Sequence, residues 1–145
     1  MIRSGVLLLA LASCRSADEQ APRAEFGVLF GGDVQDRTEL PLELDRAKQE
    51  LGLRVTFAEP VLRATRISWE IERPSELRGL DGGATRSAEL GAVTLNAGER
   101  RADGAFAFRA GDRPGSWRVR ISVEGKVVLD RSFEVVRGDE RARTR

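Results

Sequence analysis

The segment from 117 to 123 (WRVRISV) alternates strictly between apolar and polar side chains. Because successive side chains of a β-strand point to opposite faces, this period of two predicts a strand with one buried and one exposed face. Residues 66–72 alternate in the same way, with Ile67, Trp69 and Ile71 on one side. The two segments together indicate a sheet that is buried on a single face.

Other short apolar runs are separated by Gly, Pro and Asp residues, and they predict further strands. A helix is the alternative for residues 40–51, where the leucines fit one face of a helix as well as an alternating strand. Pro41 and the short length of the run favour a strand, followed by a turn or a helical loop at 45–50. The further predicted strands are 26–30, 40–44, 52–58, 89–95, 105–109 and 127–136.

About eight strands in roughly 110 residues is the number and spacing of an immunoglobulin-like β-sandwich. The sequence therefore predicts an all-β fold of about seven to eight antiparallel strands over residues 26–136. Two registers are open for the last hairpin. A three-residue loop pairs Ile121 with Leu129, whereas a two-residue turn pairs Ile121 with Val128 and needs a bulge before Phe133.

The last hairpin also carries a family resemblance. The runs PGSWRV (114–119), GKVV (125–128) and FEVV (133–136) resemble the closing hairpin of exported bacterial immunoglobulin-like domains. Among these is a domain-of-unknown-function family that ends in a similar G-x-W and F-x-V pattern. Its Phe-Gly and His-Pro pairs are Leu51-Gly52 and Arg73-Pro74 here, so the first residue differs in each pair. The resemblance rests on turn and core positions and implies the fold rather than a function.

The first fourteen residues have the pattern of an export signal. Arg3 precedes an apolar run of eight residues (GVLLLALA), which would span about 12 Å as a helix, too short to cross a bilayer. The size of the run is that of a signal-peptide apolar region. The ending Leu11-Ala12-Ser13-Cys14 resembles the lipobox of bacterial lipoproteins.

That resemblance implies cleavage before Cys14, acylation of its sulfur and its new amine, and a stable membrane attachment through several acyl chains. The residue after Cys14 is arginine rather than aspartate, which implies the outer membrane in bacteria with two membranes. The expected organisation is a signal peptide at 1–13, the lipidated Cys14 with a flexible tether to residue 25, the sandwich at 26–136 and a disordered tail at 137–145.

Composition argues against most catalytic classes. The chain has no His and a single Cys, which excludes a His-based triad, a His metal ligand and an intrachain disulfide. Its 24 basic and 23 acidic side chains are nearly balanced, without the basic excess of a nucleic-acid-binding protein. We therefore expect no cofactor, no metal, no catalytic residue and no nucleic-acid partner.

Several side chains have the chemistry of a catalytic, sugar-binding or calcium-binding site. Glu70 and Glu72 share a strand face but are expected to face water, and Trp69 and Trp117 are expected in the core rather than in a sugar-stacking platform. Aspartates in glycine-rich turns have oxygens that suit calcium, although such residues are ordinary turn formers. These aspartates are Asp33, Asp36, Asp81, Asp103 and Asp112.

The connection at 74–87 is long enough to be a binding loop. Its candidate recognition residues are Leu77, Arg78, Leu80 and Asp81. The sequence thus predicts a lipid-anchored envelope protein whose non-catalytic domain binds a protein or a polysaccharide. The alternatives are a carbohydrate-binding or carboxylate-based hydrolytic accessory module and a surface adhesin.

Overall fold

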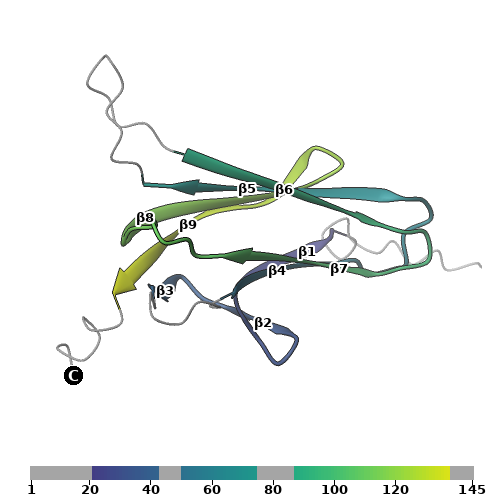
Figure 1. Ribbon diagram of the computed structural model, residues 1–145. Coiled ribbons are helices and arrows are strands. Elements are labelled where there is room, and N and C mark those ends of the chain that lie inside the picture. Colours follow the sequence, from purple (N-terminus) through teal and green to yellow (C-terminus); the bar gives the residue numbers. More distant parts are fainter. Residues whose placement is uncertain (1–20, 43–49, 75–86, 138–145) are drawn as a thin grey trace, which may run out of the picture.

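The computed structural model describes residues 21–42, 50–74 and 87–137, which form nine β-strands and no helix. The strands lie in two layers (Figure 1). They are β1 (Arg23–Phe30), β2 (Asp33–Asp36), β3 (Glu39–Leu42), β4 (Glu50–Thr56), β5 (Thr65–Arg73), β6 (Ser87–Leu95), β7 (Arg101–Ala107), β8 (Gly115–Val123) and β9 (Lys126–Arg137).

The smaller sheet has the order β2-β1-β4-β7 and the larger sheet the order β3-β9-β8-β5-β6. In an immunoglobulin fold the first, second and fifth strands form one sheet, and the third, sixth and seventh form the other. If the short β2 and β3 are set aside, β1, β4 and β7 match the first set, and β5, β8 and β9 match the second. The predicted immunoglobulin-like β-sandwich is therefore confirmed.

The core lies between the two sheets, where the alternating apolar side chains meet. Trp117, Val119 and Ile121 of β8 and Ile67 and Ile71 of β5 are all buried, as the period of two predicted. An aromatic cluster fills one half of the core. In it the Trp117 ring centroid lies 5.5 to 6.2 Å from those of Phe106, Phe108 and Phe133.

The last hairpin adopts the two-residue turn with a bulge. Glu124 and Gly125 both have positive φ (49° and 81°), as a two-residue hairpin turn of type I′ requires. A register shift between Ile121 and Ser122 then restores the pairs of Ile121 with Leu129 and Trp117 with Phe133. The structure thus has the two-residue turn and the bulge of one alternative, but the bulge comes between the turn and Ile121, which therefore pairs with Leu129 as in the other alternative.

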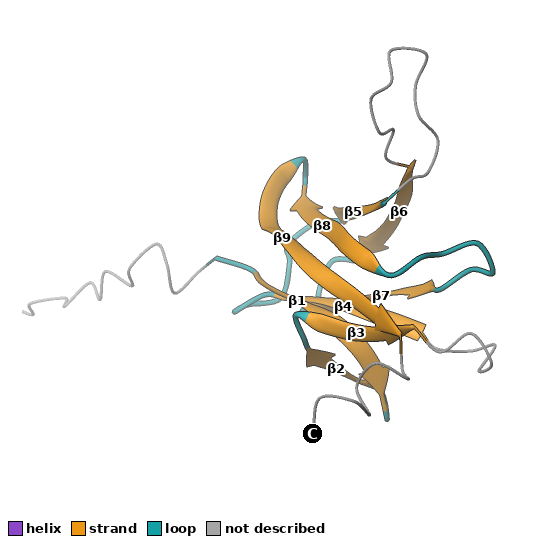
Figure 2. Ribbon diagram, turned by 90° about the vertical axis from the view of Figure 1, so that its left-hand side faces the viewer, coloured by secondary structure: helices purple, strands orange, loops and turns teal. Residues whose placement is uncertain are grey.

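Two features of the fold differ from the prediction. The strand β2 was missed because its sequence, DVQD, carries one apolar residue and has no buried side chain. The strand β3 runs parallel to β9, so the sandwich is not entirely antiparallel (Figure 2). The strands also begin at Arg23 and end at Arg137, slightly outside the expected domain of 26–136.

We name the two ends of the sandwich by what lies at them. Strand pairing places Arg23 beside Thr56, and Thr56 beside Arg101. The amino-terminal end therefore holds the start of β1 and the connections 57–64, 96–100 and 124–125, and the far end holds the connection 108–114 and the last residues of β5 and β9 (Figure 1). In the described ranges, no helix is long and apolar enough for a membrane span.

Candidate functional site

The outer face of the larger sheet carries a groove of about 450 Å³. Strand alternation builds it, because the side chains that face away from the core on β5, β6 and β8 lie next to one another in the antiparallel register. Its lining combines charged, hydroxyl and aliphatic groups. The lining includes Arg66, Ser68, Glu70, Leu90, Ala92, Arg120 and Ser122.

Beside the groove, charged side chains pair with one another across three strands. The Arg118 guanidinium donates two hydrogen bonds to the Asp130 carboxylate (2.6 and 2.8 Å), and Arg120 donates one to the same carboxylate (3.1 Å). Arg120 also lies 3.5 Å from Glu70. The hydrogen bond from Arg118 lowers the pKa of Asp130 and raises that of Arg118, so both groups stay ionised at neutral pH.

The other border of the groove is β6, the last strand of its sheet. Leu90 points out of this strand and is 76% exposed, while its neighbour Glu89 points inward to Arg73 and Arg109. No strand of the described chain pairs with the second edge of β6. In the sequence, Leu90 falls on the opposite face of its strand from Val93 and Leu95, which contact the core. This alternation is the sequence signal that could have identified Leu90 as exposed.

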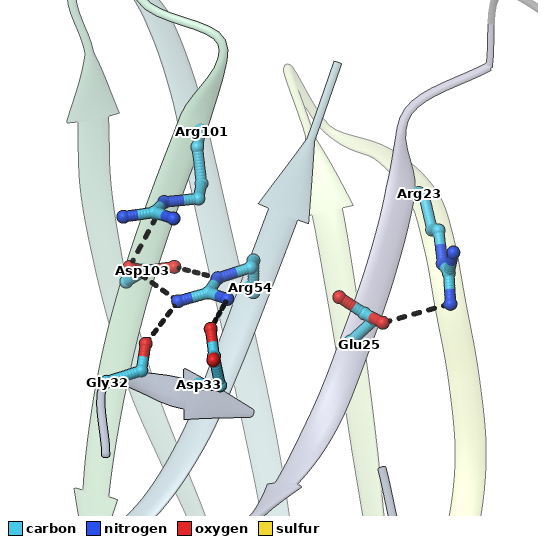
Figure 3. Close-up of polar contacts among 7 residues, drawn as sticks. All are labelled: Arg23, Glu25, Gly32, Asp33, Arg54, Arg101 and Asp103. Carbon is cyan, nitrogen blue, oxygen red and sulfur yellow. Dashed lines mark hydrogen bonds and ion pairs between the residues drawn. The ribbon is translucent and has the colours of Figure 1, made fainter. Parts of the chain in front are cut away.

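A second group of charges covers the outer face of the smaller sheet (Figure 3). Arg54 of β4 donates to Asp103 (2.7 and 3.2 Å), to Asp33 (2.9 Å) and to the Gly32 carbonyl (2.6 Å). The hydrogen bonds from Arg54 to Asp103 and Asp33 raise the pKa of Arg54 further above its usual range. This group fastens the β1–β2 turn to β4 and β7.

A third group lies at the far end, inside the sandwich. The Arg73 guanidinium stacks on Phe106 and Trp117, 4.9 and 5.6 Å from their ring centroids. It donates to Glu89 (2.7 Å), and its Nε lies 2.9 Å from Asp112, whose side chain is 5% exposed. Because the Nε–H is not directed at that oxygen, the contact with Asp112 is an ion pair without a hydrogen bond.

Ion pairs with arginines account for four of the five aspartates considered for calcium. Asp33 and Asp103 pair with Arg54, Asp36 pairs with Arg131, and Asp112 pairs with Arg73. Within residues 21–42, 50–74 and 87–137, no three carboxylate or thiol side chains gather in a way that could hold a metal ion. The described aspartates thus hold arginines in place.

Trp117 is a core residue, whereas Trp69 is partly buried, packs against the core and also lines the groove. Trp117 is 1% exposed, and its Nε1–H donates to the Arg113 carbonyl (3.0 Å). The ring of Trp69 lies over Gly91, where a Cβ atom would come within 2.2 Å of it, and it also contacts Gly104 of the opposite sheet. Gly91 and Gly104 therefore make room for the Trp69 ring, and Trp117 cannot stack on a sugar.

The site residues singled out in the sequence divide into two sets. Glu70 and Glu72 lie on the outer face of β5 and are half-buried beside the arginines of β8. The second set lies outside the described residues and comprises Cys14 and the predicted loop residues Leu77, Arg78, Leu80 and Asp81. Asp81 is also the fifth calcium candidate. The groove and Leu90 were not found from the sequence.

No protein-family model matches the chain, and no curated protein matches its sequence. Among solved structures, an immunoglobulin-like protein from Pseudomonas aeruginosa is similar, with a TM-score of 0.51 and 19% identity over 82% of this chain and 99% of that one. A DNA-bound alkylpurine DNA glycosylase from Pseudomonas fluorescens has a TM-score of 0.36 and 16% identity over 78% of this chain and 30% of that one, too distant to carry an inference. The chain thus has an immunoglobulin-like fold, and the resemblance seen in its sequence holds at that level.

Proposed function

We propose that the protein is a lipid-anchored component of the bacterial cell envelope whose immunoglobulin-like domain binds a partner protein and catalyses no reaction. The anchor is Cys14, placed by the lipobox resemblance directly after a short apolar run. The start of the domain is compatible with this, because β1 begins at Arg23, nine residues after Cys14. In a bacterium with two membranes, the arginine at position 15 favours the outer membrane.

The binding surface is the groove together with the free edge of β6, and this is the observation that carries the binding role. Natural proteins protect exposed edge strands with lysine, proline, bulges, inward-pointing charges, a covering loop or very short length, and of these the described chain gives β6 one inward-pointing charge, Glu89. The nine residues of β6 (SAELGAVTL) contain neither lysine nor proline, and the strand presents Leu90 to solvent. An extended segment of a partner protein can add to such an edge through main-chain hydrogen bonds and place a side chain against Leu90.

The charges of the groove favour a protein over a polyanionic polysaccharide. Arg118 and Arg120 are already paired with Asp130 and Glu70, so of the arginines on this face Arg66 is left to meet a polyanion. Trp117 is buried, and Trp69, although it lines the groove, packs its ring against Gly91 and the core, which disfavours an open aromatic platform for a neutral sugar. The lowered pKa of Asp130 also makes this carboxyl a poor general acid at neutral pH, which supports a binding role.

The anchor is tested by metabolic labelling with a fatty acid. Wild type and Ser16→Ala, a small change two residues beyond the lipobox, should incorporate the label and sediment with membranes. Cys14→Ala should lose both properties, because no other cysteine exists in the chain. A Cys14→Ala protein that still carries the label would overturn the lipid anchor.

The binding surface is tested in the native envelope with a photo-crosslinking residue at Ala92, which lines the groove next to Leu90. We expect a protein adduct of one size that disappears when Leu90→Asp is added. Val127→Asp is the matched control, since Val127 is also exposed but does not line the groove, and it should keep the adduct. An adduct sensitive to glycan hydrolases would assign a polysaccharide instead, and an adduct that survives Leu90→Asp would remove the groove as the binding surface.

A further inference from the structure

The loop between β4 and β5 exposes Leu62 at the amino-terminal end of the sandwich. Leu62 is 97% exposed, the highest value among the large apolar side chains of the described residues. We infer that this end of the domain lies on the membrane surface that holds the anchor and that Leu62 enters the interface of the bilayer. The inference rests on the proposed lipid anchor and adds an orientation to it.

The loop holds Leu62 outward by its own hydrogen bonds. The Val61 N–H donates to the Glu99 carbonyl (2.9 Å), and the Gly98 N–H donates to the Val61 carbonyl (2.8 Å), so loops 57–64 and 96–100 are tied together. Arg100 adds a hydrogen bond to the Ala58 carbonyl (2.7 Å). Val61 packs against the core, whereas the next residue, Leu62, faces solvent. The exposure of Leu62 is thus a property of an ordered loop.

The length of chain between the anchor and the domain brings this end close to the membrane. Nine residue steps separate Cys14 from Arg23, and a fully extended chain of that length spans at most about 32 Å. Arg23 begins β1 at the same end of the sandwich as Leu62, since it pairs with Thr56, the residue before loop 57–64. The amino-terminal end is therefore the part of the domain that the anchor holds nearest to the lipid.

The charges at this end suit an anionic lipid surface. Seven basic side chains lie in the three connections, in the three strand residues next to each of them and in the first three residues of β1, against five acidic ones, which leaves an excess of two positive charges. Basic groups near a bilayer are attracted to anionic headgroups, and an apolar side chain between them can enter the interface. The basic residues are Arg23, Arg54, Arg63, Arg66, Arg100, Arg101 and Lys126, and the acidic residues are Glu25, Glu59, Glu99, Asp103 and Glu124.

The test uses the full-length acylated protein in vesicles of phosphatidylethanolamine and phosphatidylglycerol. A nitroxide label is placed at Leu62→Cys or, as the matched control, at Leu90→Cys, which is also an exposed leucine but lies on the groove face. Acylated Cys14 has no free thiol, so the label reacts with the introduced cysteine. We expect the Leu62 label to be more accessible to oxygen, which concentrates in lipid, and at least threefold less accessible to a water-soluble nickel chelate than the Leu90 label.

Two outcomes would contradict the inference, and they differ in what they say about the anchor. If both variants carry fatty acid and bind vesicles but their labels are equally accessible to the nickel chelate, the orientation is wrong and the anchor stands. If neither variant is acylated or retained by vesicles, the anchor and the orientation both fail. Adding Arg63→Glu to Leu62→Cys should raise accessibility to nickel when the contact exists, and no change would also count against it.

Discussion

At the far end of the sandwich a guanidinium, that of Arg73, lies inside the aromatic core. At the amino-terminal end a leucine, Leu62, lies almost entirely in solvent. At the far end Arg73 is paired with Glu89 and Asp112 and stacked on Phe106 and Trp117, so its charge is satisfied within the sandwich. The amino-terminal end is held together by backbone hydrogen bonds between two loops, which leaves side chains available for contact with a surface.

Burial of charge and the proposed contact with the membrane thus lie at opposite ends of the sandwich. A buried ion pair contributes little net stability compared with apolar side chains of the same size, but it becomes costly when one partner is removed. An exposed leucine contributes little to folding. Substitutions at the far end should therefore change stability, and those at the amino-terminal end should change mainly what the domain touches.

The largest expected effect is at Trp117. Trp117→Ala removes the ring that contacts three phenylalanines and Arg73, and it should lower the free energy of unfolding by about 3 to 5 kcal/mol. Urea denaturation measures the loss. Leu62→Ala at the other end is the control and should stay within about 0.5 kcal/mol of wild type. Equal losses for the two variants would remove the distinction between the ends.

A somewhat smaller loss is expected for Arg73→Met. Methionine keeps the contact with the aromatic rings but leaves Asp112 without a cation and Glu89 with Arg109 alone, which should cost roughly 3 kcal/mol. Arg66→Met, on the exposed face of the same strand, should be nearly neutral.

A double-mutant cycle identifies the cause. Adding Asp112→Asn to Arg73→Met should recover about 1 to 3 kcal/mol, because the unpaired buried charge is then removed. Additive losses from the two substitutions would show that Arg73 acts through packing alone.

Substitution of one glycine at each end tests whether the two connections need a positive φ. Gly98 in the connection 96–100 has a φ of +90°, so Gly98→Ala should cost about 1 to 2 kcal/mol although nothing blocks its Cβ atom. Gly111 in the connection 108–114 also has open space around it but no positive φ, and Gly111→Ala should be neutral or slightly stabilising. Thermal unfolding of both variants tests this, and a neutral Gly98→Ala would mean that the loop holding Leu62 is not constrained.

The smallest effect is expected between the ends, at Asp130. Hydrogen bonds from Arg118 and Arg120 lower its pKa in the folded protein, so its contribution to stability is present above the unfolded pKa of about 3.9. That contribution is lost as pH falls through the lower folded value. Asp130→Asn should therefore slightly reduce the Tm at pH 7, and the difference from wild type should shrink as the pH falls below the unfolded value of about 3.9.

Ser132→Asn is the matched control for Asp130→Asn, because Ser132 lies on the same face of the same strand and opposite Arg118. Its Tm difference from wild type should not change with pH. An Asp130→Asn difference that grows as pH falls would contradict the sign of the pKa shift.

Much of the fold could be predicted from the phase of the apolar side chains. The alternation in β5 and β8 identified buried residues because the inward face of a sandwich strand has to be apolar. The burial of Arg73 could not be predicted in this way. Arg73 lies on the same inward face as Ile67 and Ile71, but it is charged and therefore does not continue the apolar pattern. The strand β2 and the parallel pairing of β3 with β9 depend on backbone hydrogen bonds, which side-chain patterns do not report.

The candidate site was harder to predict than the fold. The groove requires residues of β5, β6 and β8 to be neighbours, and that proximity follows from the strand order of the folded sheet. The exposure of Leu62 depends on the path of one loop and the hydrogen bonds of Val61. The anchor, by contrast, was predicted from Cys14 and its three preceding residues because the enzymes that process lipoproteins read a linear sequence.

The distance of each end from the bilayer tests the account most directly. A fluorescent donor on Leu62→Cys or on Gly111→Cys, in acylated full-length protein on vesicles with acceptor-labelled headgroups, reports that distance by energy transfer. Because strands of nine residues span about 30 Å, we predict strong transfer from position 62 and a donor at position 111 that lies about 30 Å farther from the lipid. Equal transfer from the two positions, or stronger transfer from position 111, would contradict the proposed orientation of an anchored domain.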